Sequence, residues 1–222
     1  MRGACDERFR FILDRLGARV FEESEDVIYG VWKDFTLAYT NPSWARFAMQ
    51  NDASQLYLEW GLGRSVLEAC VPALRPFYER AWQRVLETGE PFVHEYVCHA
   101  PEVRRRYVMR VLPAAGEALV VSNALAEVRT ETGEGPSFSD DTYLRSDGWI
   151  EECPHCRRVR ALASATPNRW DFVPSLLARL RSPSVTSALC PLCFAYHYHQ
   201  SFTPDELRAV MDELMGSATR RR

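Results

Sequence analysis

The sequence contains no apolar run that approaches the roughly 18 residues needed to cross a membrane. Its N-terminal segment, MRGACDERFRFILDRLG, mixes charged and apolar residues and lacks the unbroken hydrophobic region of a signal peptide. We therefore expect a cytoplasmic protein without a membrane span. The cysteines number seven, which is odd, and a cytoplasmic chain keeps its thiols reduced.

The sequence also lacks the motifs that most often carry catalysis. No Ser-His-Asp set, recognisable pair of carboxylates or phosphate-binding loop is present. The net charge of −3 argues against a protein that coats nucleic acid or a membrane surface. We predict that the chain is not an enzyme, that it does not bind membranes, and that it does not bind nucleic acid with sequence specificity.

Two CxxC pairs in the last third of the chain are the most informative feature that is present: Cys153, Cys156, Cys190 and Cys193. A CxxC turn holds two thiolates close enough to share one metal ion, and two such turns supply the four sulfurs of tetrahedral zinc. The 33 residues between the pairs exceed the usual spacing of a zinc ribbon. We therefore predict that one zinc ion binds these four cysteines and holds together a small subdomain.

Other functions of the cysteines remain open. Four thiolates can also hold an iron–sulfur cluster. The segment Cys153-Pro-His-Cys156 resembles the dithiol of some thioredoxin-like oxidants, although residues 148–152 are short for the strand that precedes the motif in that fold. Buried free cysteines can also serve as small hydrophobic residues.

Histidines and arginines are concentrated around the cysteine pairs. His155, His197 and His199 are expected to lie outside the set of metal ligands, because four cysteines already complete it. Between the first and last of these cysteines the sequence has six arginines and one acid, Asp171. Arginines near four thiolates would stabilise a zinc site that carries a charge of −2, and they could alternatively contact nucleic acid.

A polar, glycine-containing stretch divides the chain. We predict five segments: an N-terminal amphipathic helix at 1–19, a folded unit at 20–128, a linker at 129–142, a four-cysteine metal-binding module at 143–200, and a C-terminal helix with a basic tail at 201–222. The last helix begins with a capping box, because Thr203 is followed three residues later by Glu206.

The first unit combines helices with alternating apolar segments. Helices are predicted at 6–17, where Phe9, Ile12 and Leu13 share a face, at 73–88, and after Asn41, which is followed by proline. Strands are predicted at 26–32, 35–40, 91–99, 104–112 and 117–124, the last being a central strand. The order predicts an α+β fold: an antiparallel, five-stranded sheet with helices on one face.

Three passages of this unit resemble a PAS domain, over about residues 20–128: FTLAYTNPSWARFA at 35–48, GRSVLEACVPALRPFYERAWQRVLETGEPF at 63–92, and HEYVCHAPEVRRRYVMRVLPAAGEALVVSNAL at 94–125. The resemblance implies a PAS-like sheet and a sensor or protein-interaction role. The second unit resembles the C-terminal segment of many bacterial PAS proteins, in which a CxxC, basic residues, a tryptophan and a CPxC follow one another.

The PAS ligand is unknown from sequence. Haem-binding members of the family use a histidine on the long helix, and the helix at 73–88 has none. The flavin-binding motif with its reactive cysteine is also absent. A ligand cleft between helices and sheet could be lined by one cysteine and four aromatic residues: Cys70, Trp44, Phe47, Phe77 and Trp82.

We therefore expect a bacterial-type signalling protein in which a PAS-like sensor is joined to a structural zinc module and acts through a partner protein. We also expect a homodimer with the helix at 6–17 as its contact. One alternative is a transcription-related regulator that binds nucleic acid through the basic cysteine module. A second alternative is a thiol redox protein that uses the Cys153–Cys156 dithiol.

Overall fold

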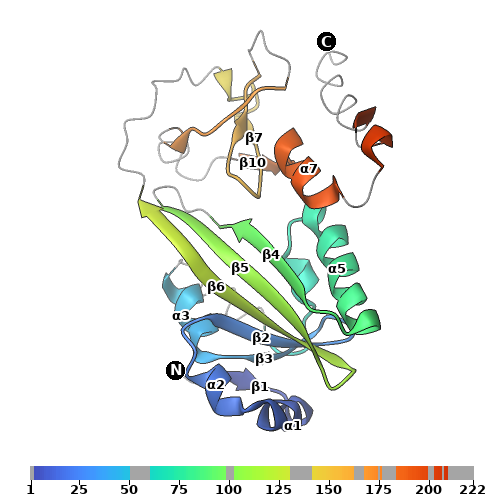
Figure 1. Ribbon diagram of the computed structural model, residues 1–222. Coiled ribbons are helices and arrows are strands. Elements are labelled where there is room, and N and C mark those ends of the chain that lie inside the picture. Colours follow the sequence, from blue (N-terminus) through green and yellow to red (C-terminus); the bar gives the residue numbers. More distant parts are fainter. Residues whose placement is uncertain are drawn as a thin grey trace. The chain divides into compact units, whose positions relative to one another are not determined.

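The computed structural model describes residues 3–50, 61–98, 103–130, 142–162, 168–174, 176, 184–199, 203–206 and 208–209 (Figure 1). The chain separates into two compact units: one comprises Met1–Tyr96 with Arg106–Glu127, and the other comprises Val97–Arg105 with Val128–Arg222. Within the described ranges, no helix is both long and apolar enough to cross a bilayer.

Six strands form the sheet of the first unit, in the order β1–β3–β2–β6–β5–β4. They are β1 (Ala4–Cys5), β2 (Val27–Trp32), β3 (Leu37–Thr40), β4 (Phe92–Val97), β5 (Val103–Ala114) and β6 (Ala118–Thr130). The registers of β1 with β3, β3 with β2, and β2 with β6 are antiparallel. The predicted α+β class is confirmed, and β1 adds a sixth strand to the five expected.

Strand β6 lies inside the sheet, between β2 and β5, as its apolar run predicted. Its residues Ala118 to Val121 are all buried. Successive side chains of a strand point to opposite faces. Burial of four consecutive residues therefore requires that both faces of the sheet are covered at this strand.

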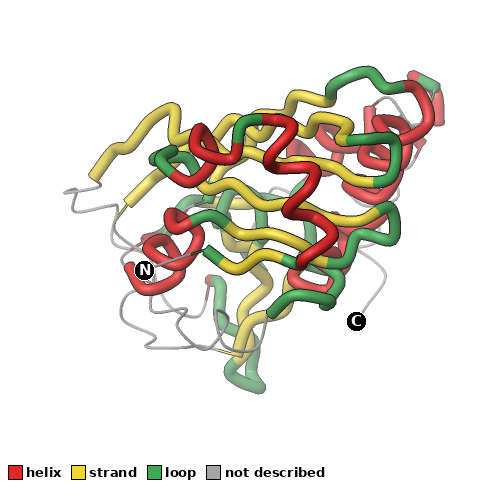
Figure 2. The backbone as a smooth tube through the Cα atoms, turned by 90° about the horizontal axis from the view of Figure 1, so that it is seen from below, coloured by secondary structure: helices red, strands yellow, loops and turns green. Residues whose placement is uncertain are grey.

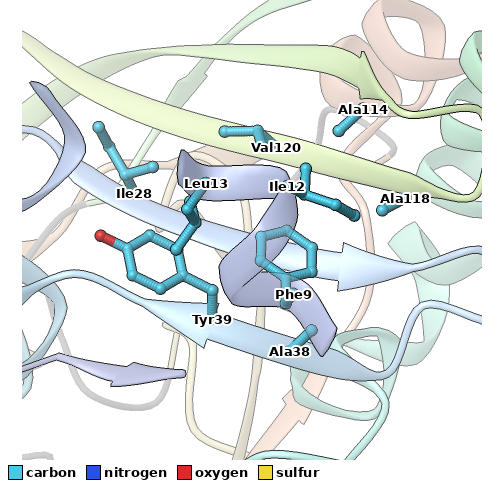
Figure 3. Close-up of a cluster of buried hydrophobic side chains, with 9 residues drawn as sticks. All are labelled: Phe9, Ile12, Leu13, Ile28, Ala38, Tyr39, Ala114, Ala118 and Val120. Carbon is cyan, nitrogen blue, oxygen red and sulfur yellow. The ribbon is translucent and has the colours of Figure 1, made fainter. Parts of the chain in front are cut away.

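Helix α1 (Glu7–Leu16) covers one of these faces (Figure 3). Asp6 begins the helix by accepting hydrogen bonds from the amides of Arg8 and Phe9, and Gly17 ends it in the left-handed conformation. Its apolar stripe is buried with side chains from β2, β3 and β6: Phe9, Ile12, Leu13, Ile28, Tyr39 and Val120. The stripe predicted as a dimer contact thus covers the chain's own sheet.

Further helical segments accompany the other face: α3 (Pro42–Gln50), the 3-10 turns η1 (Val66–Ala69) and η2 (Pro72–Leu74), and α5 (Arg75–Thr88). Another helix, α2 (Ala18–Glu22), follows α1 directly. Asn41 caps α3 as predicted, because its Oδ1 accepts the amide of Trp44 at 3.1 Å. Figure 2 shows helices lying across the strands of the sheet.

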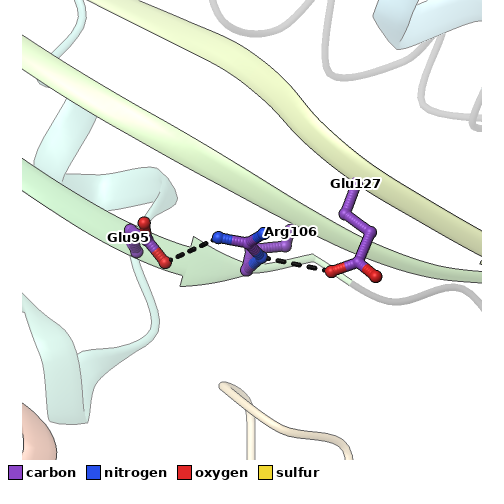
Figure 4. A network of polar contacts seen from close by, with 3 residues as sticks. All are labelled: Glu95, Arg106 and Glu127. Carbon is purple, nitrogen blue, oxygen red and sulfur yellow. Dashed lines mark hydrogen bonds and ion pairs between the residues drawn. The ribbon is translucent and has the colours of Figure 1, made fainter.

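An ion-pair network joins three strands of the first unit (Figure 4). Arg106 on β5 contacts Glu95 on β4 at 2.9 Å and Glu127 on β6 at 3.3 Å. All three side chains keep more than a third of their surface exposed. The network therefore ties neighbouring strands at a solvated surface.

A second sheet belongs to the cysteine unit, with strand order β10–β7–β8–β9. Its strands are β7 (Trp149–Glu152), β8 (Val159–Arg160), β9 (Trp170–Asp171) and β10 (Ser184–Ser187). It is accompanied by a small apolar cluster: Tyr143, Ile150, Val159, Ala161, Val173 and Leu176. Helix α7 (Pro191–Tyr198) follows β10.

The predicted capping box near the C-terminus is present. Thr203 and Glu206 exchange hydrogen bonds: the amide of Glu206 donates to Thr203 Oγ1 at 3.3 Å, and the amide of Thr203 donates to Glu206 Oε2 at 2.8 Å. The apolar positions of the predicted C-terminal helix fall outside the described residues, as does most of the predicted linker, 131–141.

Candidate functional site

The first CxxC pair lies in the turn that joins β7 to β8. The two strands are antiparallel, with Glu152 opposite Val159. The amide of Cys153 donates to the carbonyl of Arg158 at 2.8 Å, and the amide of Arg157 donates to the carbonyl of Cys153 at 2.9 Å. Arg157 adopts a positive φ of 60°, which tightens the turn. These contacts hold the two thiols of the pair on one side of the hairpin end.

The second pair lies at the start of α7. Cys190 occupies the N-cap position, Pro191 the first helical position, and Cys193 the first turn. The amide of Phe194 donates to the carbonyl of Cys190 at 2.9 Å, which closes this turn. Both cysteines are buried.

Parallel pairing of β10 with β7 brings the two pairs together. Ser187 lies opposite Glu152, and the amide of Ala188 donates to the carbonyl of Glu152 at 3.1 Å. Parallel strands end at the same edge of a sheet. The chain therefore reaches Cys153 and Cys190 from adjacent strand ends, although the pairs are distant in sequence.

The four sulfur atoms form one cluster. The Sγ atoms of Cys153, Cys156, Cys190 and Cys193 all lie within 4.8 Å of one another, and those of Cys156 and Cys190 are 3.7 Å apart. A zinc–sulfur bond of about 2.3 Å gives a tetrahedron with edges of about 3.8 Å. The cysteines are thus positioned to bind a metal ion, with the spacing of a single tetrahedral centre.

The thiols perturb one another strongly. Hydrogen bonding with Cys156 is the main cause that lowers the pKa of Cys153, whereas hydrogen bonding with Cys153 is the main cause that raises the pKa of Cys193 and of Cys156. Thiols this close share their protons, because several thiolates together repel one another. A divalent cation removes that restriction, since a coordinating thiol is deprotonated.

A pair of histidines connects the two CxxC segments beside the sulfurs. The Nε2 of His197 lies 2.6 Å from the Nδ1 of His155, with the rings in an edge-to-face arrangement at 4.5 Å. His197 is buried, whereas His199 is exposed. All three histidines were expected outside the ligand set, but nothing in the spacing indicated that two of them would contact each other.

Three of the described arginines of the module pair with acids. Arg157 contacts Glu152, Arg160 contacts Glu151 at 3.2 Å, and Arg169 contacts Asp171 at 2.7 Å. Burial raises the pKa of Glu152 to about 7, and Arg157 opposes that shift. A separate arginine, Arg158, places its Nη1 4.0 Å from the Sγ of Cys156.

A separate cavity of about 330 Å³ lies in the first unit, between the sheet and the segments α3 and η1. Val27, Tyr29 and Asn123 line it, whereas the alternate positions Ile28 and Val120 belong to the cluster under α1. The cavity is therefore on the face of the sheet opposite α1.

Three of the five residues predicted to line a ligand cleft do line the cavity, and two do not. Trp44, Phe47 and Cys70 line the cavity, whereas Phe77 and Trp82 are not among its lining residues. Trp82 is buried against Tyr29 and Phe35, and Phe77 contacts His94 with tilted rings whose centroids are 4.9 Å apart. The helical stripe identified these aromatic residues as internal but did not show which would face a space.

Four further aromatic residues that the sequence did not single out also face the cavity: Tyr29, Tyr78, Tyr96 and Tyr107. Tyr78 lies on α5, whereas Tyr29, Tyr96 and Tyr107 lie on β2, β4 and β5. Their place at the cavity could be read only once the face of each strand was known.

Comparison with known proteins gives one family. The family model of the PAS fold matches residues 21–131, half of the chain. No curated protein matches the chain.

Several solved structures are similar to part of the chain. The PAS domain of the Cronobacter turicensis RpfR quorum-sensing receptor, in complex with C12:0, is 15% identical, with a TM-score of 0.37 over 47% of this chain and 97% of that one. The PAS domain of Bordetella pertussis BvgS is 14% identical, with a TM-score of 0.40 over 51% of this chain and 88% of that one. Vibrio cholerae VqmA is 12% identical, with a TM-score of 0.36 over 60% of this chain and 54% of that one.

Proposed function

The chain belongs to the PAS fold family, and on this basis we propose that it is a signalling protein whose PAS domain senses a small molecule and acts through a partner protein. The cavity on the face of the sheet opposite α1 carries the sensor part of this proposal. A site enclosed by a sheet and helices is where a small ligand can change the packing of both. The proposed role is one of binding, not of catalysis.

We further propose that the metal is zinc and that its role is structural. The 3.7 Å separation of Cys156 and Cys190 supports a single ion, because one tetrahedral centre has edges of about 3.8 Å. Four cysteine ligands leave no open position for substrate, as in structural zinc sites. The apolar cluster of this unit is small, so metal binding would supply much of its folding free energy. Since the ligands must be reduced thiols, we place the protein in the cytoplasm.

Elemental analysis of protein purified without added metal tests the zinc proposal. We expect one zinc per chain and no visible absorption. Visible absorption with iron and inorganic sulfide would instead identify a cluster. A folded second unit without any metal would refute both.

The two alternatives draw less support. Three arginines between Cys153 and Cys193 pair with acids. Two of these acids, Glu151 and Glu152, lie just before Cys153 in the sequence. This pairing lowers the positive potential available to phosphates. A redox role for the dithiol Cys153–Cys156 would leave unexplained why both CxxC pairs meet in one cluster.

We propose that the protein is a homodimer that uses the outer side of α1 and α2. Phe11, Leu16 and Val20 expose 74%, 46% and 70% of their surface there. Large apolar side chains exposed together are typical of interaction surfaces. The inner stripe of α1 cannot serve this purpose, because Phe9 and Leu13 are buried in the sheet's own cluster.

The signalling role is tested by proximity labelling in the source organism. Wild-type protein is compared with Ala48→Phe, which fills the cavity, and with Cys193→Ser, which removes a metal ligand. We expect at least one protein that is labelled reproducibly by the wild type and less by one of the variants. Identical labelling by all three would contradict signalling through either site.

A further inference from the structure

The cavity of the PAS domain has a defined size and an aromatic wall. Its 330 Å³ is about twice the 150 Å³ of an engineered apolar cavity that binds benzene. Six aromatic side chains line it: Tyr29, Trp44, Phe47, Tyr78, Tyr96 and Tyr107. Aromatic rings pack favourably against these walls in stacked or edge-to-face geometry. The space fits a molecule of two fused rings.

The described part of the wall is also uncharged. None of the described residues that line the cavity is Asp, Glu, Lys, Arg or His. Moving an ion into such a place is very unfavourable unless a counter-charge is present. The titratable groups on the wall agree with this picture, because burial raises the pKa of Tyr29 and raises the pKa of Cys70 to about 11. A bound molecule must therefore be neutral.

Two hydrogen bonds through the side chain of Asn123 connect three strands at the cavity wall. The hydroxyl of Tyr96 on β4 donates to the Oδ1 of Asn123 on β6 at 3.0 Å, and the Nδ2 of Asn123 donates to the carbonyl of Val27 on β2 at 3.3 Å. An amide oxygen accepts two hydrogen bonds, and Tyr96 supplies one. Asn123 also hydrogen-bonds the side chain of Tyr29: burial raises the pKa of that phenol, and this hydrogen bond lowers it, as an amide NH₂ donor does. Asn123, which is 6% exposed, is thus an acceptor placed at the edge of an apolar space.

We infer that this cavity binds a neutral, two-ring aromatic molecule that carries one hydrogen-bond donor, and that Asn123 recognises the donor. The inference rests on the proposed sensor function and specifies its ligand class. Recognition at Asn123 has a direct route to the sheet, because the residue contacts β2 and β4 from its place on β6. A ligand that alters the contact with Tyr96 changes the relation of β6 to β4, which are not neighbours in the sheet.

Three probes of similar shape test the ligand class on the full chain: 2-naphthol, naphthalene and 2-naphthoate, titrated by ligand-observed NMR at pH 7. We expect 2-naphthol to bind about fivefold more tightly than naphthalene, the effect of one net hydrogen bond. We expect the anion 2-naphthoate to bind at least about tenfold more weakly than 2-naphthol. Failure of all three to bind folded protein, or equal binding of 2-naphthoate and 2-naphthol, would overturn the inference.

Two matched pairs of variants locate the site. Ala48→Phe fills the cavity from α3 and should abolish probe binding, whereas Met49→Phe, at an exposed neighbouring position, should not change it. Asn123→Leu should abolish the preference for 2-naphthol over naphthalene, whereas Tyr96→Phe, which leaves the amide in place, should retain it. Binding that survives Ala48→Phe, or a preference lost only in Tyr96→Phe, would contradict the assignment.

Folding of each variant is checked by circular dichroism, and zinc content and partner labelling are measured on the same proteins. If the probes fail while zinc and labelling are normal, the ligand class alone is wrong. Another outcome is that the probes bind as expected while labelling is the same in wild type and Ala48→Phe. That result would support the ligand class and contradict the proposed signalling through the cavity.

Discussion

The ring of Phe9 lies over the Cα of Gly30 and fills the space that a Cβ would occupy. Phe9 is fully buried, and it also stacks with Tyr39 at 6.2 Å and packs edge-on to Trp32 at 5.3 Å. The glycine in the middle of β2 is therefore what allows α1 to approach the sheet. Glycine at this position weakens the strand itself and is compensated by the aromatic contact.

A methyl group at Gly30 should therefore destabilise the first unit. We expect Gly30→Ala to lower the free energy of unfolding by about 1–3 kcal/mol, the usual effect of overpacking a core. Urea denaturation measures the change. Gly61→Ala, where a Cβ meets nothing within 4 Å, is the control and should be near neutral. Adding Phe9→Leu to Gly30→Ala should cause less destabilisation than the two single effects combined.

Loss of one metal ligand should unfold only the cysteine unit. We expect Cys193→Ser to lose bound zinc and the structure of residues 142–199, while the PAS unit retains its cooperative unfolding, because metal binding supplies folding free energy only where the ligands lie. Mass spectrometry of the metal and hydrogen exchange measure the two effects. Cys5→Ser, outside the cluster, should retain one zinc per chain. Full exchange protection in a zinc-free Cys193→Ser protein would contradict a structural role.

Alkylation of Cys70 should have an unusual pH dependence. Burial raises the pKa of this thiol from 9.0 to about 11, although Arg75 opposes the shift. Only the thiolate reacts, so at pH 8 the rate with iodoacetamide should be about a hundredfold below that of the unfolded chain, even before access is considered. The folded thiol has the higher pKa, so its contribution to stability is present below pH 9 and is lost as the pH rises towards 11.

Peptide mapping by mass spectrometry follows Cys70 separately from the other cysteines. The same peptide in guanidinium chloride provides the reference. A folded-state midpoint near pH 9 would show that the thiol is solvated and that the cavity is open to bulk water. Protection by 2-naphthol would independently place that probe beside Cys70.

Polar substitution on the outer side of α1 and α2 should give a folded monomer. Phe11→Gln and Val20→Gln remove exposed apolar area without touching the buried cluster. Light scattering should then report the monomer mass, with an unchanged circular dichroism spectrum. Arg10→Gln, at an exposed neighbouring position, should remain dimeric. A wild-type chain that is monomeric at high micromolar concentration would end the dimer proposal.

The ion pairs of Arg106 should matter little and should depend on salt. Hydrogen bonding to Glu95 is the main cause that raises the pKa of Arg106, yet all three partners are well solvated. Exposed pairs of this kind contribute little and are screened by salt. We expect Arg106→Gln to lower the urea midpoint slightly at low ionic strength and to match the wild type in 1 M salt. A large, salt-independent loss would indicate a packing role for the arginine stem.

The sequence predicted local features well and tertiary features poorly. The capping of α3 by Asn41 is encoded by adjacent residues, and this prediction is confirmed; the capping of α1 by Asp6 is equally local. Strand β1 has only two residues, so it carries no periodic signal, and it forms because Ala4 and Cys5 pair with β3. Helix α1 can cover a second face of the sheet because Gly30 leaves room for Phe9. The spacing of apolar residues in the sequence does not reveal this contact.

The candidate sites show the same division. The spacing of each CxxC pair is local, and the four cysteines it indicated do lie in one cluster. The contact between His155 and His197 depends on the pairing of β7 with β10, which are distant in sequence. For the cavity, helical spacing identified internal aromatic residues but could not separate Trp44, which lines the space, from Trp82, which fills the adjacent core.

The parallel pairing of β10 with β7 has a consequence for synthesis on the ribosome. Cys190 can reach Cys153 only after β10 has been made, and β10 follows every strand of the PAS sheet along the chain. Domains fold as units in the order in which they are synthesised. The first unit can therefore fold while the cysteine unit is still incomplete, and the proposed metal can bind all four cysteines only afterwards. A cell short of zinc would accumulate molecules with a finished sensor and an unfinished second unit.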